Sequence, residues 1–255
     1  MKKIKILIIL ATIILSIGMG IYVYKWEYRK PLFEVDFFSL NRGRAVFIRT
    51  PENKTILIGG GQNSEVIREL TKVMPFYRKK IDYVVIPSAT PAQIGGLIEI
   101  VDRYDIGEIF KSKYMATSTV LTQLMKNIRK KKIHIEEVER GDEMDIGSLH
   151  VEVLFPNEDF KFNKSSLPEL GLSITYDKTG VFLIGNLSKT IQKDILKSLD
   201  IMTTQNLLEF YNSAAPAKVL DELVEELKPK FIFSTKEKGS SWVSDGKVWN
   251  KYEEF

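Results

Sequence analysis

The sequence contains no cysteine and only two histidines, so two of the side-chain types that proteins use most often to bind zinc are scarce. Neither a disulfide bond nor a thiolate metal site can form. The carboxylates do not gather in a pattern such as DxDxDG, which would predict a calcium or magnesium site. No cofactor is therefore expected from the residues themselves.

The two histidines, His134 and His150, each stand between apolar residues in a strand-like segment. Side chains alternate between the two faces of a strand, so both histidines are expected to face solvent or a neighbouring strand. No GxSxG elbow surrounds Ser88, and neither GxxxxGK[ST] nor GxGxxG after a strand is present. The familiar hydrolase and nucleotide-binding motifs are thus missing.

A long apolar run occupies the N-terminal region. Residues 6–24 carry no charge, and nineteen residues are about enough for a helix to cross roughly 30 Å of hydrocarbon. Lys and Arg flank the run on both sides, and Trp26 and Tyr28 suit the headgroup level. We predict an uncleaved single-pass anchor that contacts the lipid bilayer through residues 4–24. The alternative is a cleaved signal peptide, for which residues 17–20 are a poor cleavage site.

The positive net charge belongs to this N-terminal segment. Residues 1–30 hold six Lys or Arg and one Glu, which leaves 31 basic and 32 acidic residues in 31–255. A globular part with a net charge near −1 does not resemble a nucleic-acid-binding domain, so nucleic acid is not an expected partner. The basic cluster 126–132 is interpreted as the solvated C-terminal turn of a helix. We therefore predict two parts: residues 1–30 as anchor and flanks, and residues 31–255 as one globular domain.

Strand and helix patterns alternate along the globular part. Strands are predicted at 33–38, 45–50, 55–58, 83–86, 108–110, 133–139, 148–154, 173–176, 181–184, 201–204, 231–233 and 248–252. Helices are predicted at 64–73, 97–104, 118–131, 189–198 and 216–228. Residues 141–145 read as a polar connection, and Ser240 and Ser241 as a loop. This order favours an α/β fold in which two mixed sheets pack face to face with helices outside, an αββα sandwich.

Residues 86–96, with the sequence IPSATPAQIGG, follow a buried strand and lead into a helix. Such a junction is a natural place for a metal or anion site. The loop offers only two hydroxyls and one amide. It has the position of an active site without ionisable groups.

Several stretches together resemble the metallo-β-lactamase-fold domain of ComEC-type competence proteins and their stand-alone relatives. That family reads VxFxDVGQGDA, ILIDGG, LTHPHADHIGG, LLTGD and VLKVxHHGS. The corresponding stretches here are 35–45, 56–61, 86–96 and 182–186, with a weaker match at 200–208. The resemblance spans most of 33–235 and implies a metallo-β-lactamase fold.

The same resemblance implies that the metal ligands have been replaced. The family's ligand positions fall on the following residues: Gly59, Ser88, Thr90, Ala92, Gln93 and Asn186. The two aspartates of DVGQGD fall on Ser39 and Arg44, and the late histidine pair falls near Asn206 and Leu207. None of these replacements is a usual metal ligand, and Arg44 brings a positive charge toward a place for cations, where it could contact an anion.

Two functions are compatible with these observations. The first is a membrane-anchored pseudoenzyme, with a vestigial site, that binds an unknown protein or envelope ligand on the extracytoplasmic side of the cell membrane. The second is a hydrolase or nuclease that keeps metal-dependent activity through ligands the motifs do not reveal. Loss at every motif position together favours the first, since function resides in the site and not in the fold.

Overall fold

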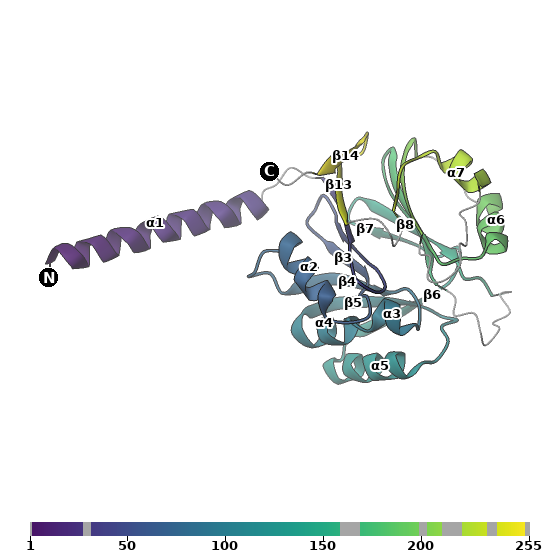
Figure 1. Ribbon diagram of the computed structural model, residues 1–255, viewed down its shortest axis with the longest axis horizontal. Helices are drawn as coiled ribbons and strands as arrows, with labels where there is room; N and C mark the ends of the chain where they lie inside the picture. Colours follow the sequence, from purple (N-terminus) through teal and green to yellow (C-terminus); the bar gives the residue numbers. More distant parts are fainter. Residues whose placement is uncertain are drawn as a thin grey trace. The chain divides into compact units, whose positions relative to one another are not determined.

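The computed structural model describes residues 2–27, 32–158, 169–198, 203–210, 221–233 and 239–252. The chain divides into two compact units, residues 1–31 and 32–255. In the first unit, α1 (Lys2–Glu27) is one continuous helix whose described side chains are almost all exposed (Figure 1). Its residues Lys3–Tyr24 are long and apolar enough to cross a membrane, with a mean hydropathy of 2.6.

The globular unit contains two sheets (Figure 1). The eight-stranded sheet has the order β14-β13-β1-β2-β3-β4-β5-β6. Its strands are β1 (Phe33–Phe38), β2 (Ala45–Arg49), β3 (Thr55–Gly59), β4 (Lys80–Ile86), β5 (Asp105–Ser112), β6 (His134–Val138), β13 (Ser240–Ser244) and β14 (Trp249–Tyr252). From β3 to β6 the strands run parallel, whereas the pairs from β14 to β3 are antiparallel.

The six-stranded sheet has the order β12-β11-β10-β9-β8-β7. Its strands are β7 (Glu143–Ile146), β8 (Leu149–Phe155), β9 (Gly171–Tyr176), β10 (Thr179–Gly185), β11 (Gln205–Phe210) and β12 (Pro229–Phe233). Helices cover the outer faces of both sheets. They are α2 (Glu65–Val73), α3 (Pro91–Ile94), α4 (Leu97–Arg103) and α5 (Thr119–Lys131) on the larger sheet, and α6 (Lys189–Ser198) and α7 (Asp221–Leu227) on the smaller one.

Alternation along the strands divides their side chains between two apolar layers. In β3, Ile56 and Ile58 pack in the core between the sheets, whereas Leu57 packs against the helices outside. In β10, Val181 and Leu183 face the inner core, and Phe182 and its neighbour Ile184 face α6 and α7. A strand buried on both faces reads as a continuous apolar run, which is why these segments show little polar alternation.

The αββα sandwich predicted from the sequence is confirmed, with local differences. Residues 143–146 form β7 instead of a polar connection, because their backbone pairs with β8. The segment around Ser240 is strand β13, since it completes the pairing of β1 on its open side. The strand expected at 201–204 begins at Gln205, and residues 201–202 and 216–220 lie outside the described part of the chain.

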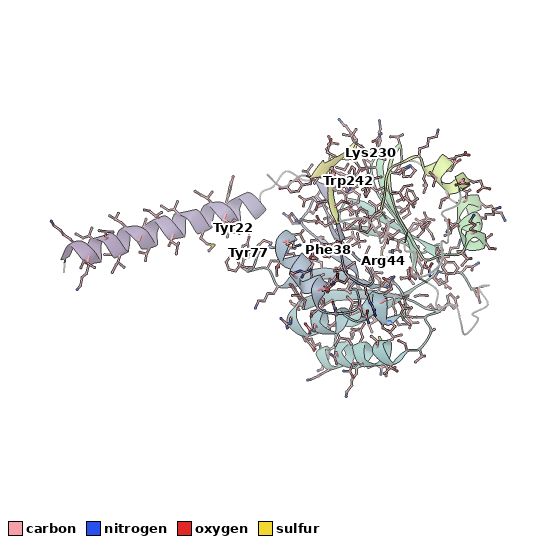
Figure 2. All side chains as sticks on the ribbon, in the orientation of Figure 1. Tyr22, Phe38, Arg44, Tyr77, Lys230 and Trp242 are labelled. Carbon is pink, nitrogen blue, oxygen red and sulfur yellow. The ribbon has the colours of Figure 1, made fainter. Side chains whose placement is uncertain are left out.

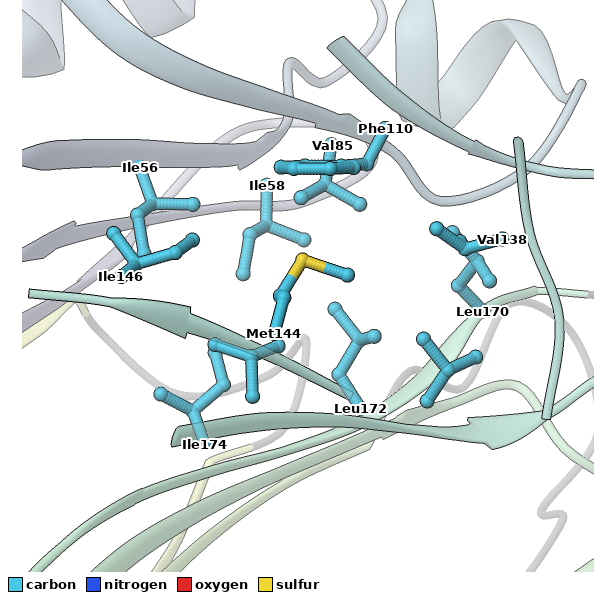
Figure 3. A pocket seen from close by; sticks show the side chains of 12 residues that line it. Ile56, Ile58, Val85, Phe110, Val138, Met144, Ile146, Leu170, Leu172 and Ile174 are labelled. Atoms are coloured by element: carbon cyan, nitrogen blue, oxygen red, sulfur yellow. The ribbon is translucent and has the colours of Figure 1, made fainter. Parts of the chain in front are cut away.

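A small cavity of about 20 Å³ lies between the two sheets, and Figure 3 shows side chains from both sheets pointing into it. All of its lining residues are apolar: Ile56, Ile58, Val85, Phe110, Val138, Met144, Ile146, Val151, Val153, Leu170, Leu172 and Ile174. A cavity without polar groups stays dry, so its lining side chains lose packing contacts. The inner core is therefore packed less completely than the strand patterns alone would suggest.

Adjacent valines on β4 test this difference in packing. Val85 lines the cavity, whereas Val84 packs in the outer layer beneath the helices. We expect Val85→Ile to raise the free energy of unfolding by about 0.8 kcal/mol, because the added methylene fills empty space. Val84→Ile should lower it by about 1 kcal/mol through overpacking. Chemical denaturation of both variants measures the two changes, and equal effects would show that the inner core has no usable space.

Candidate functional site

The guanidinium group of Arg44 lies inside the globular unit (Figure 2). Arg44 comes directly before β2 and is 3% exposed. It stands at the end of the larger sheet where β1 and β3 finish and β2 begins. We call this the site end of the sheet. A buried arginine needs partners, because an uncompensated charge away from water is costly.

Among the described residues, three side chains that contact the Arg44 guanidinium are Gln93, Glu169 and Glu209. Arg44 Nη2 lies 3.1 Å from Glu169 Oε2, Arg44 Nη1 donates to Glu209, and Arg44 Nε lies 3.3 Å from Gln93 Oε1. Gln93 Nε2 in turn donates to Glu169 Oε1 over 3.0 Å. We call Arg44, Gln93, Glu169 and Glu209 the Arg44 network. It joins the larger sheet and α3 to the smaller sheet, because Glu209 lies in β11 and Glu169 precedes β9.

Backbone groups hold the network in place. The amide of Gly60 donates to the carbonyl of Gln93 over 2.8 Å, and the amide of Gly61 donates to the carbonyl of Arg44 over 3.0 Å. The amide of Asn186 donates to Glu169 Oε2 over 2.9 Å. The glycine turn after β3 and the end of β10 therefore fix the side chains that carry the charges.

The balance of charge in the network is uneven, with one guanidinium beside two carboxylates. Complete burial raises the pKa of Glu209, and the neighbouring Arg44 partly offsets this effect by favouring the ionised carboxylate. The negative charge of Glu169 raises the pKa of Glu209 further. Proton binding at Glu209 is consequently linked to folding.

The structure brings some of the predicted site residues together. Arg44 and Gln93 belong to the network, Asn186 contributes its backbone amide while its side chain is exposed, and Gly59 lies directly before the glycine turn. The anions that Arg44 contacts are two carboxylates of its own chain. Arg44 thus forms an internal ion pair, and the expected contact with an external anion stays a prediction.

Ser88 and Thr90 form a separate small contact. Their hydroxyl oxygens lie 2.9 Å apart, and the amide of Thr90 donates to Ser88 Oγ over 3.3 Å. Ser88 is fully buried, and Thr90 and Ala92 are partly exposed. Within the described residues, neither hydroxyl is hydrogen-bonded to a histidine or a carboxylate that would act as a general base.

Glu169 and Glu209 were missed from the sequence. Glu209 interrupts the apolar strand sequence QNLLEF, and a charged residue in a buried strand is itself a signal that a partner is present. The resemblance puts the late family position near Asn206, which does not belong to the Arg44 network. Asn206 pairs with Gly180 near the start of β10, and its amide donates to the carbonyl of Leu227.

The side chains present do not fit the two metal ions that the resemblance implies for this fold. A guanidinium has five N–H donors and no lone pair for a metal. The oxygens of Glu169 and the amide of Gln93 are already engaged within the network. In the described ranges, no group of three or more His, Cys, Asp or Glu side chains is arranged to hold a metal ion. Beside the network lies a cavity of about 10 Å³, space for about one water molecule.

Comparison with solved structures identifies the fold. The metallo-β-lactamase-fold protein YhfI from Bacillus subtilis matches with a TM-score of 0.54 and 13% identity, over 80% of this chain and 86% of that chain. The globular unit has the metallo-β-lactamase fold.

Two further solved structures are similar to this chain. A diphosphatase of the PhnP family has a TM-score of 0.51 and 13% identity, over 80% of this chain and 86% of that chain. Unliganded yeast PDE1 has a TM-score of 0.55 and 10% identity, over 77% of this chain and 82% of that chain. No protein-family model matches the sequence, and a search of curated proteins finds no match. At such identities the likeness establishes the fold alone.

Gly185 tests how tightly the network is packed. Its φ is +55°, and an added Cβ would lie 2.1 Å from Glu169 Oε2 and 2.9 Å from Arg44 Nη2. Gly141 is the matched control, because its φ is +88° but an added Cβ meets no atom within 4 Å. We expect Gly141→Ala to cost about 1 kcal/mol from backbone strain alone. Gly185→Ala should cost about 3–5 kcal/mol, because it also displaces a buried ion pair. Denaturant unfolding compares the two, and similar losses would contradict close packing around the network.

The raised pKa of Glu209 predicts a pH dependence of known sign. A carboxyl group whose pKa is raised by folding makes its full contribution to the free energy of unfolding at pH values below its pKa in the unfolded chain, about 4.5. This contribution is lost as pH rises through the folded pKa. The free energy of unfolding of the wild type, minus that of Glu209→Gln, should therefore fall as pH rises above about 4.5.

Glu65 provides a control of opposite sign. Hydrogen bonds from the backbone and side chain of Asn41 lower the pKa of Glu65. The free energy of unfolding of the wild type, minus that of Glu65→Gln, should rise with pH over the lower part of the measured pH range. A carboxyl group with a lowered pKa contributes stability only when it is ionised. Denaturation series from pH 4 to 8 measure both differences. A slope of the same sign for both variants would refute the assignment at Glu209.

Proposed function

We propose that this chain is a membrane-anchored, catalytically inactive metallo-β-lactamase-fold protein, a pseudoenzyme that acts as a binding or scaffold module at the cell envelope. We also propose that it derives from the stand-alone relatives of ComEC-type competence proteins. The observation that carries the proposal is the Arg44 network. A fixed guanidinium lies among the side chains of a former metal site and is bonded to two buried carboxylates.

The chemistry of the guanidinium supports this reading. In metallo-hydrolases a metal ion lowers the pKa of a bound water to about 7 and leaves an open position for substrate. Arg44 supplies a positive charge, but it binds no water as a Lewis acid does. Its hydrogen-bond donors point at Gln93, Glu169 and Glu209. The group therefore stabilises the fold where a metal would activate water.

The alternative is a hydrolase that uses ligands outside the family pattern. Two of the similar structures are described as a diphosphatase of the PhnP family and as PDE1, so the fold is compatible with hydrolysis. Within the described residues, Ser88 and Thr90 have no general base, and the carboxylates nearest the former site are paired with Arg44. These observations favour the pseudoenzyme.

The proposed anchor is α1. Its apolar side chains are exposed over the span, and the three apolar clusters found among the described residues consist of residues from the globular unit. A helix of this length and composition is stable in hydrocarbon and poorly suited to water. A signal sequence passes the same test of length and composition. We propose an uncleaved anchor with the globular unit on the extracytoplasmic side, where an unidentified protein or envelope ligand would be bound.

Metal content and its effect on stability test the proposal. We expect purified protein to retain no stoichiometric zinc, manganese or iron after dialysis, and added metals to leave the melting temperature unchanged. We also expect no metal-dependent cleavage of DNA, a chromogenic phosphodiester or a β-lactam. Stoichiometric metal, or turnover that rises with metal, would overturn the proposal.

The converse variant is Arg44→Asp, which restores the family residue and places a third carboxylate beside Glu169 and Glu209. Oxygen ligands of this kind suit manganese and magnesium. The expected result is a rise in melting temperature on adding manganese. Arg68→Asp is the control, because it makes the same charge change at a side chain that is 67% exposed.

A further inference from the structure

The strand register places the start of the globular unit far from the site. Phe33 begins β1 and pairs with Ser244, and Glu34 pairs with Arg49 at the end of β2. Following the register through β3, Lys80 and Asp105 lie at this same end of the sheet. We call it the tether end, because the anchor joins the globular unit there. It is opposite the site end, about 20 Å away for strands of this length.

Exposed apolar side chains gather at the tether end. The described globular unit has four large apolar side chains classed as exposed: Phe76, Tyr77, Val248 and Tyr252. Phe76 and Tyr77 precede β4, and Val248 lies in the turn between β13 and β14. Three of the four are therefore at one end of one sheet. Phe76 is 71% exposed although its ring packs edge-on against Tyr77, so the aromatic pair presents an apolar surface to solvent.

Basic side chains also gather at the tether end. A surface cavity of about 520 Å³ at the tether end is lined by Lys79, Arg103, Lys131, Lys132 and His134, with Asp105 as the acidic member. Arg103 pairs with Glu99, and Lys131 donates to the carbonyl of Asp102. Within the described part of the chain, the ammonium groups of Lys79 and Lys132 have no hydrogen bond or ion pair. The cavity is thus positively charged and accessible.

A helix dipole explains only part of this charge. Basic residues are favoured in the last turn of a helix, which accounts for Arg103 in α4 and Lys131 in α5. It does not account for Lys79, which precedes a strand, or for the exposed Phe76 and Tyr77 beside it. Aromatic residues next to lysine and arginine are typical of surfaces that enter a lipid headgroup region.

The length of the connection favours a lipid partner. Seven residues lie between Tyr24, the end of the apolar span, and Leu32. Even fully extended, the eight Cα-to-Cα steps from Tyr24 to Leu32 reach only about 28 Å. Since β1 begins at the tether end, its aromatic and basic residues stay within a short distance of any bilayer that holds α1. Attraction of basic residues to anionic lipid acts within about a Debye length, 8 to 10 Å, so such proximity matters.

We propose that the tether end binds the surface of an anionic phospholipid bilayer, with Phe76 and Tyr77 in the headgroup region and the basic cavity receiving lipid phosphates. This inference rests on the proposed membrane anchor. It directs the Arg44 network away from the bilayer, toward soluble or envelope-bound partners. The occupant is a lipid surface because the aromatic and basic residues occur together at the end of the sheet that the anchor joins.

Vesicle sedimentation of residues 32–255 tests the surface without the anchor. This unit contains all three apolar clusters, so it is expected to fold alone. We expect binding to phosphatidylcholine vesicles containing 30% phosphatidylglycerol, and at least tenfold weaker binding to pure phosphatidylcholine or in 0.5 M salt. Equal binding to both vesicle types, or no binding to either, would overturn the proposal.

Matched variants locate the binding surface. Lys79→Gln with Lys132→Gln should weaken binding about twentyfold, whereas Lys189→Gln with Lys193→Gln, which removes two exposed charges from α6, should leave it unchanged. Phe76→Ser should weaken binding about tenfold, and Tyr252→Ser at the opposite end should not. Circular dichroism confirms that each variant folds. The proposal would be overturned if a control variant lost as much vesicle binding as its tether-end counterpart. It would also be overturned if both tether-end variants bound vesicles as well as the wild type.

An experiment on the full chain in anionic nanodiscs tests the proposed lipid-binding surface and the proposed anchor separately. Because the chain has no cysteine, single spin labels can be placed at Lys54→Cys near the tether end and at Thr117→Cys near the site end. We expect a lipid-soluble paramagnetic agent to increase the spin relaxation of the first label and not of the second. Release of the chain by alkaline carbonate would show that the anchor is wrong, independently of the vesicle result. An embedded chain with neither label near lipid would show that the surface is wrong.

Discussion

A buried arginine that pairs with two glutamates connects the two sheets of the globular unit. Arg44 comes from the larger sheet, whereas Glu169 and Glu209 come from the smaller one, so their contacts cross the interface between the sheets. Removing one partner of such a group leaves an uncompensated charge in the interior, at a cost of about 3–5 kcal/mol. The surrounding residues are constrained accordingly. Gly185 has no space for a side chain, and the turn at Gly60 and Gly61 fixes the backbone of Gln93 and Arg44.

The same interaction places a positive charge at the junction of the two sheets. The charge is covalently part of the chain, and two carboxylates lie beside it. The guanidinium has N–H donors and no lone pair for a metal ion. The charges that meet at this junction are therefore supplied by the chain itself.

The two ends of the larger sheet carry different properties. The network lies where β3 and β4 finish, as expected when parallel strands bring loops together at their carboxyl ends. The exposed aromatic and basic residues lie where those strands begin, at the end where β1 also begins. In the proposed arrangement, this end meets the bilayer and the other end stays available to a partner. This separation follows from strand direction. The loops that precede the parallel strands lie at one end of the sheet, and the loops that follow them lie at the other.

The amino-acid pattern by itself determined the fold class and the apolar N-terminal helix. Apolar runs such as 55–58 and 181–184 are continuous because both faces of each strand are buried, so their burial was readable locally. Residues 240–244 were not recognised as β13, since their strand character depends on pairing with β1, some 200 residues away in the chain. The tertiary structure alone decided the site. Glu209 lies 165 residues from Arg44, and no spacing in the sequence indicates that their charges meet. Whether Arg44 faces an external anion or an internal carboxylate depends on which loops the two sheets bring together.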